Sequence, residues 1–343
     1  MDNLSYSYDY SNDTEHFDND SLFPVEGHSS PAVGVVSMVV YALTSFLGIP
    51  GNAFVIWISG IKMKRTVNTL WFLNLAIADF LCCLSLPFSI ANIALDYHWP
   101  YGGVLCKVIP SAIILNMFAS VFILTLISLD RFALVIKPVW AQNHRTISLA
   151  YLLCAAVWIM AVLLSLPSLI HREVQDSLED HINICRYEVD GHIEAVIHIT
   201  RFVFGFLLPC LVITLCYAMI VRKVSSRFAK SRKTLKIILG VIVAFFVCWL
   251  PYHVNGILLS YAPLGSAWSD MAETLDPLVI CLAYINSCLN PILYVFMGQD
   301  FKEKVRKSLR HIVESAFSEE QTRSTVHSRG KSSMEGNSSE AQL

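Results

Sequence analysis

Seven apolar stretches, each long enough to cross a lipid bilayer as a helix, constrain this chain more than any other feature. They lie at roughly 33–60, 70–95, 104–129, 147–170, 193–221, 237–262 and 277–297. About twenty apolar residues are needed to span the hydrocarbon core, and backbone groups find no partners in lipid outside helices and closed barrels. We therefore expect an all-α membrane protein, a seven-transmembrane helix bundle. Its composition of 55% hydrophobic and 15% charged residues excludes an ordinary soluble domain.

The distribution of lysine and arginine predicts how the helices are oriented. Basic residues gather at 62–69, 130–147 and 222–236 and after residue 298, whereas the alternate loops hold few. Because cytoplasmic loops are enriched in Lys and Arg, we expect a multi-pass plasma-membrane protein with an extracellular N-terminus. The outer side would then hold 18 acidic residues against four basic ones, which attracts cationic partners.

The chain is expected to divide into four parts. Residues 1–32 form an extracellular acidic tail, 33–297 the seven-helix bundle, and 317–343 a cytoplasmic tail rich in Ser and Thr. Between them, residues 298–316 alternate basic and apolar side chains at helical spacing, which is typical of a short amphipathic helix on the membrane surface.

The stretch AYINSCLNPILY places two amides and a proline in an otherwise apolar helix. Unpartnered amides are costly in hydrocarbon, so Asn286 and Asn290 should meet polar groups of other helices. Asp79 is the only acid near the middle of an apolar stretch, and Asn116 and Ser120 lie one turn apart on another. We expect these five residues to cluster, and their oxygens suit an allosteric sodium ion. A protonated Asp79 that serves packing alone is the alternative.

Two cysteines differ from the other eight, which lie within the apolar stretches. Cys106 opens the third stretch and Cys185 sits in the loop before the fifth, both on the outer side. That side is oxidising, so the pattern predicts a disulfide between them.

Motifs along all seven stretches resemble those of the rhodopsin-like family of G-protein-coupled receptors. They occur in the family's order and at its spacing. They are Gly51-Asn52, Asp79, Cys106, Asp130-Arg131-Phe132, Trp158, Pro209 with Tyr217, Phe245 with Cys248-Trp249-Leu250-Pro251, and Asn290-Pro291-Ile292-Leu293-Tyr294.

The resemblance implies a receptor that activates a heterotrimeric G protein, and not an enzyme. Its activation switches would be Asp130, Arg131, Tyr217, Phe245, Trp249, Pro251, Pro291 and Tyr294. In that family Trp249 and Phe245 relay a change in helix packing, while Arg131 pairs with Asp130 at rest and then swings toward the G protein. The segment 230–233 lacks the acid that latches this arginine in some relatives.

Charged residues near the outer helix ends indicate a peptide ligand. Arg201 lies eight residues before Pro209, about 12 Å above it along a helix, where it requires an anion. Arg172 should end the fourth helix and Asp276 should begin the seventh, so both are expected near the mouth of the bundle. The two arginines fit a peptide carboxylate, and Asp276 fits a basic C-terminal side chain. An internal Arg201–Asp276 salt bridge is the alternative.

These residues, together with Glu194, resemble the chemoattractant branch of the family. The closest resemblance is to anaphylatoxin receptors for the fragment of complement component five. The component-three type is disfavoured, because it has a very long loop where only roughly twenty residues separate Arg172 from Glu194. Receptors of the formyl-peptide or chemerin type remain alternatives. So does a non-signalling scavenger receptor for the same ligand, against which the intact Asp130-Arg131 pair argues.

The two tails carry modification sites that fit this topology. Sequons at Asn3, Asn12 and Asn19 predict glycosylation. Tyr6, Tyr8 and Tyr10 lie among acids, as sulfated tyrosines do, and would help to hold a basic protein ligand. The expected phosphorylation sites, which would recruit arrestin, are Ser315, Ser318, Thr322, Ser324, Thr325, Ser328, Ser332 and Ser333. The resemblance suggests an inhibitory G protein, and no nucleic-acid partner is expected.

Overall fold

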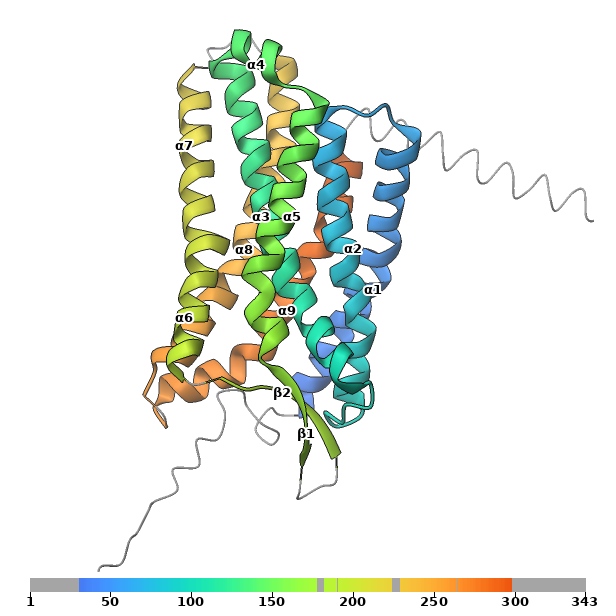
Figure 1. Ribbon diagram of the computed structural model, residues 1–343, viewed down its shortest axis with the longest axis vertical. Coiled ribbons are helices and arrows are strands. Elements are labelled where there is room, and N and C mark those ends of the chain that lie inside the picture. The colour runs from blue at the N-terminus through green and yellow to red at the C-terminus, as the bar shows by residue number, and fades with distance from the viewer. Residues whose placement is uncertain (1–30, 178–181, 190, 224–228, 264, 298–343) are drawn as a thin grey trace, which may run out of the picture.

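A computed structural model describes residues 31–177, 182–189, 191–223, 229–263 and 265–297 of the chain. Its long helices run side by side as a bundle (Figure 1). They are α1 (Pro31–Trp57), α2 (Val67–Ala94), α3 (Gly102–Ile136), α5 (Ile147–Ile170), α6 (Gly191–Phe202) with α7 (Leu208–Lys223), α8 (Ala229–Tyr261) and α9 (Ala267–Met297). Two π-helical turns extend these rods, η1 (Ile58–Lys62) after α1 and η2 (Val203–Leu207) between α6 and α7.

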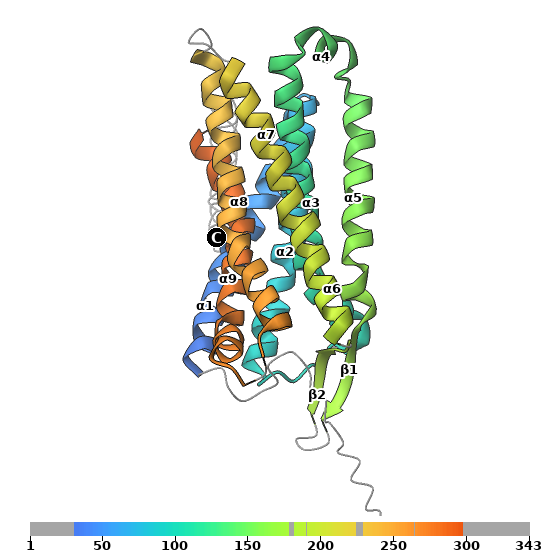
Figure 2. The same cartoon turned by 90° about the vertical axis from the view of Figure 1, so that its left-hand side faces the viewer.

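The described part of the chain contains seven helical rods that are long and apolar enough to cross a membrane. This confirms the predicted bundle. The short helix α4 (Pro138–His144) lies at one end, and the antiparallel hairpin of β1 (Arg172–Ser177) and β2 (Ile182–Tyr187) lies at the other. Figure 2 shows the same arrangement from the side. We refer to these as the α4 end and the hairpin end.

Several helices begin or end beyond the apolar stretches that predict them. The third stretch was expected to end at residue 129, but α3 continues through Asp130 and Arg131 to Ile136. The seventh was expected to begin at 277, but α9 begins at Ala267. Hydropathy marks only the part of a helix that suits lipid, whereas backbone hydrogen bonds continue through charged residues.

The loop before the fifth rod contains the hairpin, which the sequence did not predict. Arg172 was expected to end the fourth helix, but α5 ends at Ile170 and Arg172 begins β1. The predicted disulfide is confirmed: Cys106 of α3 is bonded to Cys185 of β2, with 5.5 Å between the Cα atoms. Trp99 fixes the hairpin a second time, because its backbone N donates to Asn183 O at 2.6 Å.

The core lies along α3, which contacts α2, α5, α7 and α8. In the most apolar part of α3, 67% of the residues are buried inside the protein. The corresponding share for α5, which lies at the outside of the bundle, is 22%. Met117, Phe118, Val121 and Ile123 of α3 are fully buried. The apolar side chains left exposed on the outer helices are those that a surrounding bilayer would cover.

The first helix packs closely because two of its glycines lack side chains. A Cβ atom on Gly48 would overlap Sγ of Cys83 on α2 and would lie 3.6 Å from the Cβ of Cys288 on α9. A Cβ atom on Gly51 would lie 3.3 Å from Pro291 Cβ on α9. Small residues at such positions let helix backbones approach in a membrane.

Parts of the predicted organisation lie outside the described residues. These are the acidic tail with its glycosylation and sulfation sites, the surface helix at 298–316 and the tail with its phosphorylation sites. The side chain of Tyr294 also lies outside the described part, although its backbone belongs to α9.

Replacing Gly48 by Ala should destabilise the bundle by about 1–3 kcal/mol, the usual cost of overpacking. The added methyl group collides with Cys83, so the additional change Cys83→Ala should restore most of the loss. Thermal unfolding of the purified protein measures the loss and its recovery. Gly103→Ala is the matched control, because a Cβ there meets nothing within 4 Å. Equal melting temperatures for Gly48→Ala and Gly103→Ala would contradict the close packing.

Candidate functional site

A buried arginine and a half-buried aspartate lie at the hairpin end, each bonded to a neutral group. Arg201 of α6 is 8% exposed, and its Nη1 donates to the hydroxyl of Tyr252 on α8 at 3.2 Å. Asp276 of α9 accepts from Nδ2 of Asn255 on α8 at 2.9 Å. The alternative of an internal Arg201–Asp276 salt bridge is not formed among the described residues. Each of the two predicted residues is bonded to a side chain of α8 instead, Tyr252 or Asn255, and the sequence did not single these two out.

Glu194, another predicted ligand residue, is buried on the same helix as Arg201. Its Oε1 lies 3.6 Å from Nε2 of His198, one turn further along. His198 in turn packs against Gly256 of α8, where a Cβ would overlap its ring. The spacing of four residues between Glu194 and His198 could have revealed this pair in the sequence.

Arg172 reaches this end of the bundle from the hairpin. It is half-buried at the start of β1, where it is paired in register with Tyr187. The disulfide ties β2 to α3, so the hairpin holds a fixed position beside the helix ends. All four predicted ligand residues therefore lie at the hairpin end, on three separate elements: β1, α6 and α9.

An aromatic column leads from Arg201 into the core. The ring of Tyr252, whose hydroxyl binds Arg201, lies 5.5 Å from the ring of Trp249. Trp249 is fully buried, and its ring lies 5.9 Å from that of Phe245, one turn deeper on α8. Tyr252 thus connects Arg201 to Trp249 and Phe245, the two aromatic residues for which the family resemblance implies a relay role. Pro251 lies within α8 at the same level.

The predicted polar cluster forms in the middle of the bundle. Asp79 of α2 is fully buried, and its Oδ2 accepts from Nδ2 of Asn290 on α9 at 2.7 Å. On α3, Ser120 Oγ donates to Asn116 Oδ1 at 3.1 Å. Asn116 Nδ2 donates to Ser287 Oγ on α9 at 2.9 Å, which joins the third and seventh rods.

Asn286 differs from the prediction. It is buried, yet neither its Nδ2 nor its Oδ1 makes a hydrogen bond within the described part of the chain. Ser287, the next residue, takes the expected place: its hydroxyl binds Asn116, and its carbonyl accepts from Asn52 Nδ2 at 2.8 Å. One step along a helix rotates a side chain by about 100°, and the sequence cannot decide which of two adjacent polar residues faces the cluster.

A third group lies at the α4 end, where the expected Asp130–Arg131 ion pair is present and Arg145 adds a second, closer partner of Asp130. Asp130 binds Arg145 through both oxygens, at 2.6 Å from Nε and 3.1 Å from Nη2. Arg131 lies further from the same carboxylate, at 3.8 Å. Both arginines also donate to Oδ1 of Asn68 on α2, at 2.6 and 2.7 Å. Arg145 follows α4, and no sequence signal connects it or Asn68 with Asp130.

Two further predicted switch residues, Tyr217 and Pro291, and the motif residue Trp158 lie on three different helices. Tyr217 lies on α7, and its buried hydroxyl makes no hydrogen bond to the described residues. Pro291 lies inside α9 against Gly51. Trp158 Nε1 donates to Asn74 Oδ1 at 2.9 Å and so joins α5 to α2.

A charged mouth, a polar core and an arginine at the opposite end are compatible with a membrane receptor, and comparison with known proteins shows the family. The family described as 7 transmembrane receptor (rhodopsin family) matches residues 51–294, and the chain belongs to that family. It is 54% identical to the C3a anaphylatoxin chemotactic receptor of Oncorhynchus mykiss, over the whole of both chains. It is also 57% identical to the receptor of that name from Danio rerio, over 86% of this chain and 81% of the relative.

A second group of relatives is less similar. The C5a anaphylatoxin chemotactic receptor 1 of Homo sapiens is 40% identical, over 95% of this chain and 97% of the relative. The expected order of the two types is therefore reversed. The short loop between Arg172 and Glu194 therefore does not separate this chain from receptors named for C3a.

Arg145→Gln should lower the stability of the receptor by about 1–3 kcal/mol, because it leaves the mostly buried Asp130 carboxylate without its two shortest hydrogen bonds. Thermal unfolding of the purified protein measures the loss. Arg222→Gln, which removes an exposed arginine near the end of α7, is the control. If both variants unfold at the same temperature as the wild type, the Arg145–Asp130 ion pair contributes nothing to stability.

Proposed function

We propose that the chain is a chemotactic receptor that binds an anaphylatoxin at the hairpin end and activates a G protein at the α4 end. The hairpin end faces the outside of the cell in this proposal, which follows from the basic residues of the opposite loops. The observation that carries the proposal is that the buried Arg201 and the half-buried Asp276 are each bonded to a neutral side chain of α8, Tyr252 or Asn255.

The two charges suit the end of a peptide chain. A guanidinium binds a carboxylate through charge-assisted hydrogen bonds, and Asp276 would accept the guanidinium of a C-terminal arginine in the same way. Each now bonds to a neutral group, Tyr252 or Asn255. An exchange of those partners for charged ones would offset the cost of burying the two charges. Arg172 and Glu194 would contact the ligand beside them.

The relatives favour the component-three fragment as the ligand. The two receptors named for C3a are 54% and 57% identical to this chain, and that named for C5a in Homo sapiens is 40% identical. The fragment of component five, which the sequence first suggested, is the comparison ligand. An acidic tail with sulfated tyrosines would hold the body of either basic protein.

Signal transfer would follow the aromatic column. When ligand displaces Arg201 from Tyr252, the rings of Tyr252, Trp249 and Phe245 shift, and α8 moves relative to α3. Arg131 would then leave Asn68 and meet an inhibitory G protein, and arrestin would bind the phosphorylated tail. Asp130 would stay attached to Arg145 during this step, since that bond is shorter than its contact with Arg131.

Removal of the ligand's terminal arginine should reveal the contact with Asp276. We expect the trimmed component-three fragment to lose about 2–5 kcal/mol at this buried contact, measured as its potency in nucleotide exchange on a purified inhibitory G protein. Asp276→Ala should weaken the intact fragment but leave the trimmed one nearly unchanged. Arg201→Ala should weaken both, because both end in a carboxylate.

A double-mutant cycle supplies the decisive comparison. Strictly additive losses from Asp276→Ala and from removal of the arginine would show that the two groups never meet. Greater potency of the component-five fragment would reverse the choice of ligand. Tight binding of both fragments without any nucleotide exchange would instead identify a scavenger receptor.

The central cluster supports the proposal of an allosteric sodium ion. Asp79 and Asn290 are joined through Oδ2 of the aspartate and Nδ2 of the asparagine. The other oxygen of Asp79, Oδ1, and the amide oxygen of Asn290 are buried and accept no hydrogen bond from the described residues. A carboxylate and an amide oxygen, with the hydroxyl of Ser120 nearby on α3, are the hard ligands that a small cation prefers. Such an ion would hold α2, α3 and α9 in the resting arrangement.

Sodium should therefore lower the affinity for the activating fragment, because an ion that binds one state shifts the equilibrium toward it. Asp79→Asn should remove this dependence. Fragment binding to receptor membranes is measured in sodium and in an equal concentration of potassium, which keeps ionic strength constant. A sodium response that survives in Asp79→Asn would contradict the site.

A further inference from the structure

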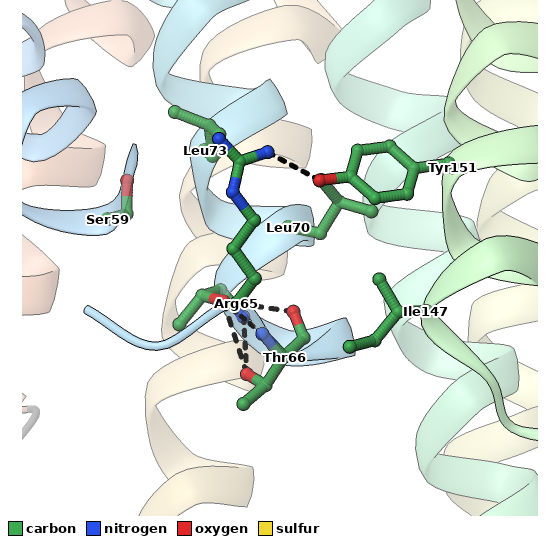
Figure 3. A pocket seen from close by; sticks show the side chains of 8 residues that line it. Ser59, Arg65, Thr66, Leu70, Leu73, Ile147 and Tyr151 are labelled. Carbon is green, nitrogen blue, oxygen red and sulfur yellow. Dashed lines mark hydrogen bonds between the residues drawn. The ribbon is translucent and has the colours of Figure 1, made fainter. Parts of the chain in front are cut away.

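Two groups of polar side chains take no part in the proposed signal transfer. At the α4 end, Arg65 Nη1 donates to the hydroxyl of Tyr151 at 2.5 Å, across the groove between the starts of α2 and α5 (Figure 3). That bond joins two helices. At the hairpin end, His198 of α6 lies among the residues proposed to hold the ligand, and no step of the proposed binding uses it.

His198 is fitted closely between α6 and α8. Its Nε2 lies 3.6 Å from Oε1 of Glu194, and the two side chains are 12% and 4% exposed. On the other side, its ring lies against Gly256 of α8, where even a Cβ atom would overlap it. The imidazole therefore fills the space that Gly256 leaves, and the packing of the two helices fixes its position.

The same turn of α8 connects His198 with Asp276. Asn255 donates to the Asp276 carboxylate at 2.9 Å, and the next residue, Gly256, contacts the His198 ring. The imidazole and the Asp276 carboxylate are close enough to interact electrostatically. His198 is thus near both Glu194 and Asp276, the two acids that the proposed function assigns to the ligand.

The other charged and titratable groups around His198 are not acids. Arg201 lies three residues further along α6, and its Nη1 binds the hydroxyl of Tyr252. His253 of α8 interacts electrostatically with both Arg201 and His198, and its ring packs 5.4 Å from that of Tyr252. A positive charge on His198 would therefore be balanced by Glu194 and Asp276.

From this arrangement we propose that His198 makes the recognition of the ligand's C-terminal arginine dependent on extracellular pH. Histidine is the side chain whose charge changes between pH 5 and 8. The neutral imidazole leaves both acids to the guanidinium of the ligand. The imidazolium pairs with Glu194 and repels the guanidinium that approaches Asp276. Acid therefore lowers the preference of the receptor for a ligand that retains its arginine. This inference rests on the proposed function, because it concerns the same site.

The test compares the affinities of the intact and the arginine-trimmed component-three fragment for membranes that carry the full-length receptor. Both are measured at about pH 7.4 and about pH 6.0, the range in which histidine changes its charge, at constant ionic strength. General effects of pH on the two fragments cancel in the ratio of their affinities. In the wild type, acid should lower the preference for the intact fragment about fivefold or more, because the proton and the arginine oppose each other as coupled ligands. His198→Gln, which stays neutral, should lose most of this response.

Two further variants make the comparison specific. His192→Gln removes an exposed histidine of the same helix and should keep the wild-type pH response. Glu194→Gln removes the partner of the imidazolium and should reduce the response as His198→Gln does. Thermal unfolding shows whether each variant is folded, and Glu194→Gln supplies the comparison if His198→Gln does not fold.

The outcomes separate this inference from the proposed function. A wild-type preference that does not change with pH, or an equal pH response in the wild type and a folded His198→Gln receptor, would overturn the role of His198. The second result would assign the response to another group, such as Asp276 or His253. A loss of response in His192→Gln as large as that in His198→Gln would overturn it as well. Equal affinity of the two fragments already at about pH 7.4 would instead contradict the contact between the arginine and Asp276, and this inference with it.

Discussion

The absence of hydrogen-bonding partners in lipid governs this structure. Each crossing segment must satisfy its own backbone, so each is a helix, and each polar side chain within it must find a partner on another helix. The Asp79–Asn290 bond and the Asn116–Ser287 bond meet that requirement at the centre of the bundle. They tie the second, third and seventh rods together, and the two charged ends are built on that frame.

The same requirement explains why polar groups are joined in pairs that can change partners. At the mouth, Arg201 and Asp276 are each bonded to one neutral side chain of α8. At the α4 end, Arg131 shares the carboxamide oxygen of Asn68 with Arg145. A charge bonded to a neutral partner is satisfied well enough to fold, yet it gains more from a charged partner when one arrives. Such bonds suit a protein that changes its helix packing when it binds another molecule.

At the α4 end, Arg131 is held by residues outside the sixth rod. The sixth rod lacks an acid to hold Arg131 in the segment 230–233. Within the described residues, Asn68 of α2 holds this arginine, and Arg145 takes both oxygens of Asp130. The resting arrangement thus depends on the second rod and on the segment after α4.

The sequence by itself determined the seven helices and the Cys106–Cys185 bond, because helix length and the oxidising outer side can be read from the chain directly. It also predicted that Asp79, Asn116, Ser120 and Asn290 need polar partners inside the bundle, and the structure shows an Asp79–Asn290 bond and an Asn116–Ser120 bond. Only the tertiary structure decided that Ser287 and not Asn286 faces Asn116, and that Arg145 binds Asp130. The first choice depends on how each helix is rotated about its axis, and the second joins residues of separate elements. The rotation of each helix and the contacts between elements are set by the packing of the whole bundle. They cannot be read from the hydropathy of the sequence or from the spacing of its residues.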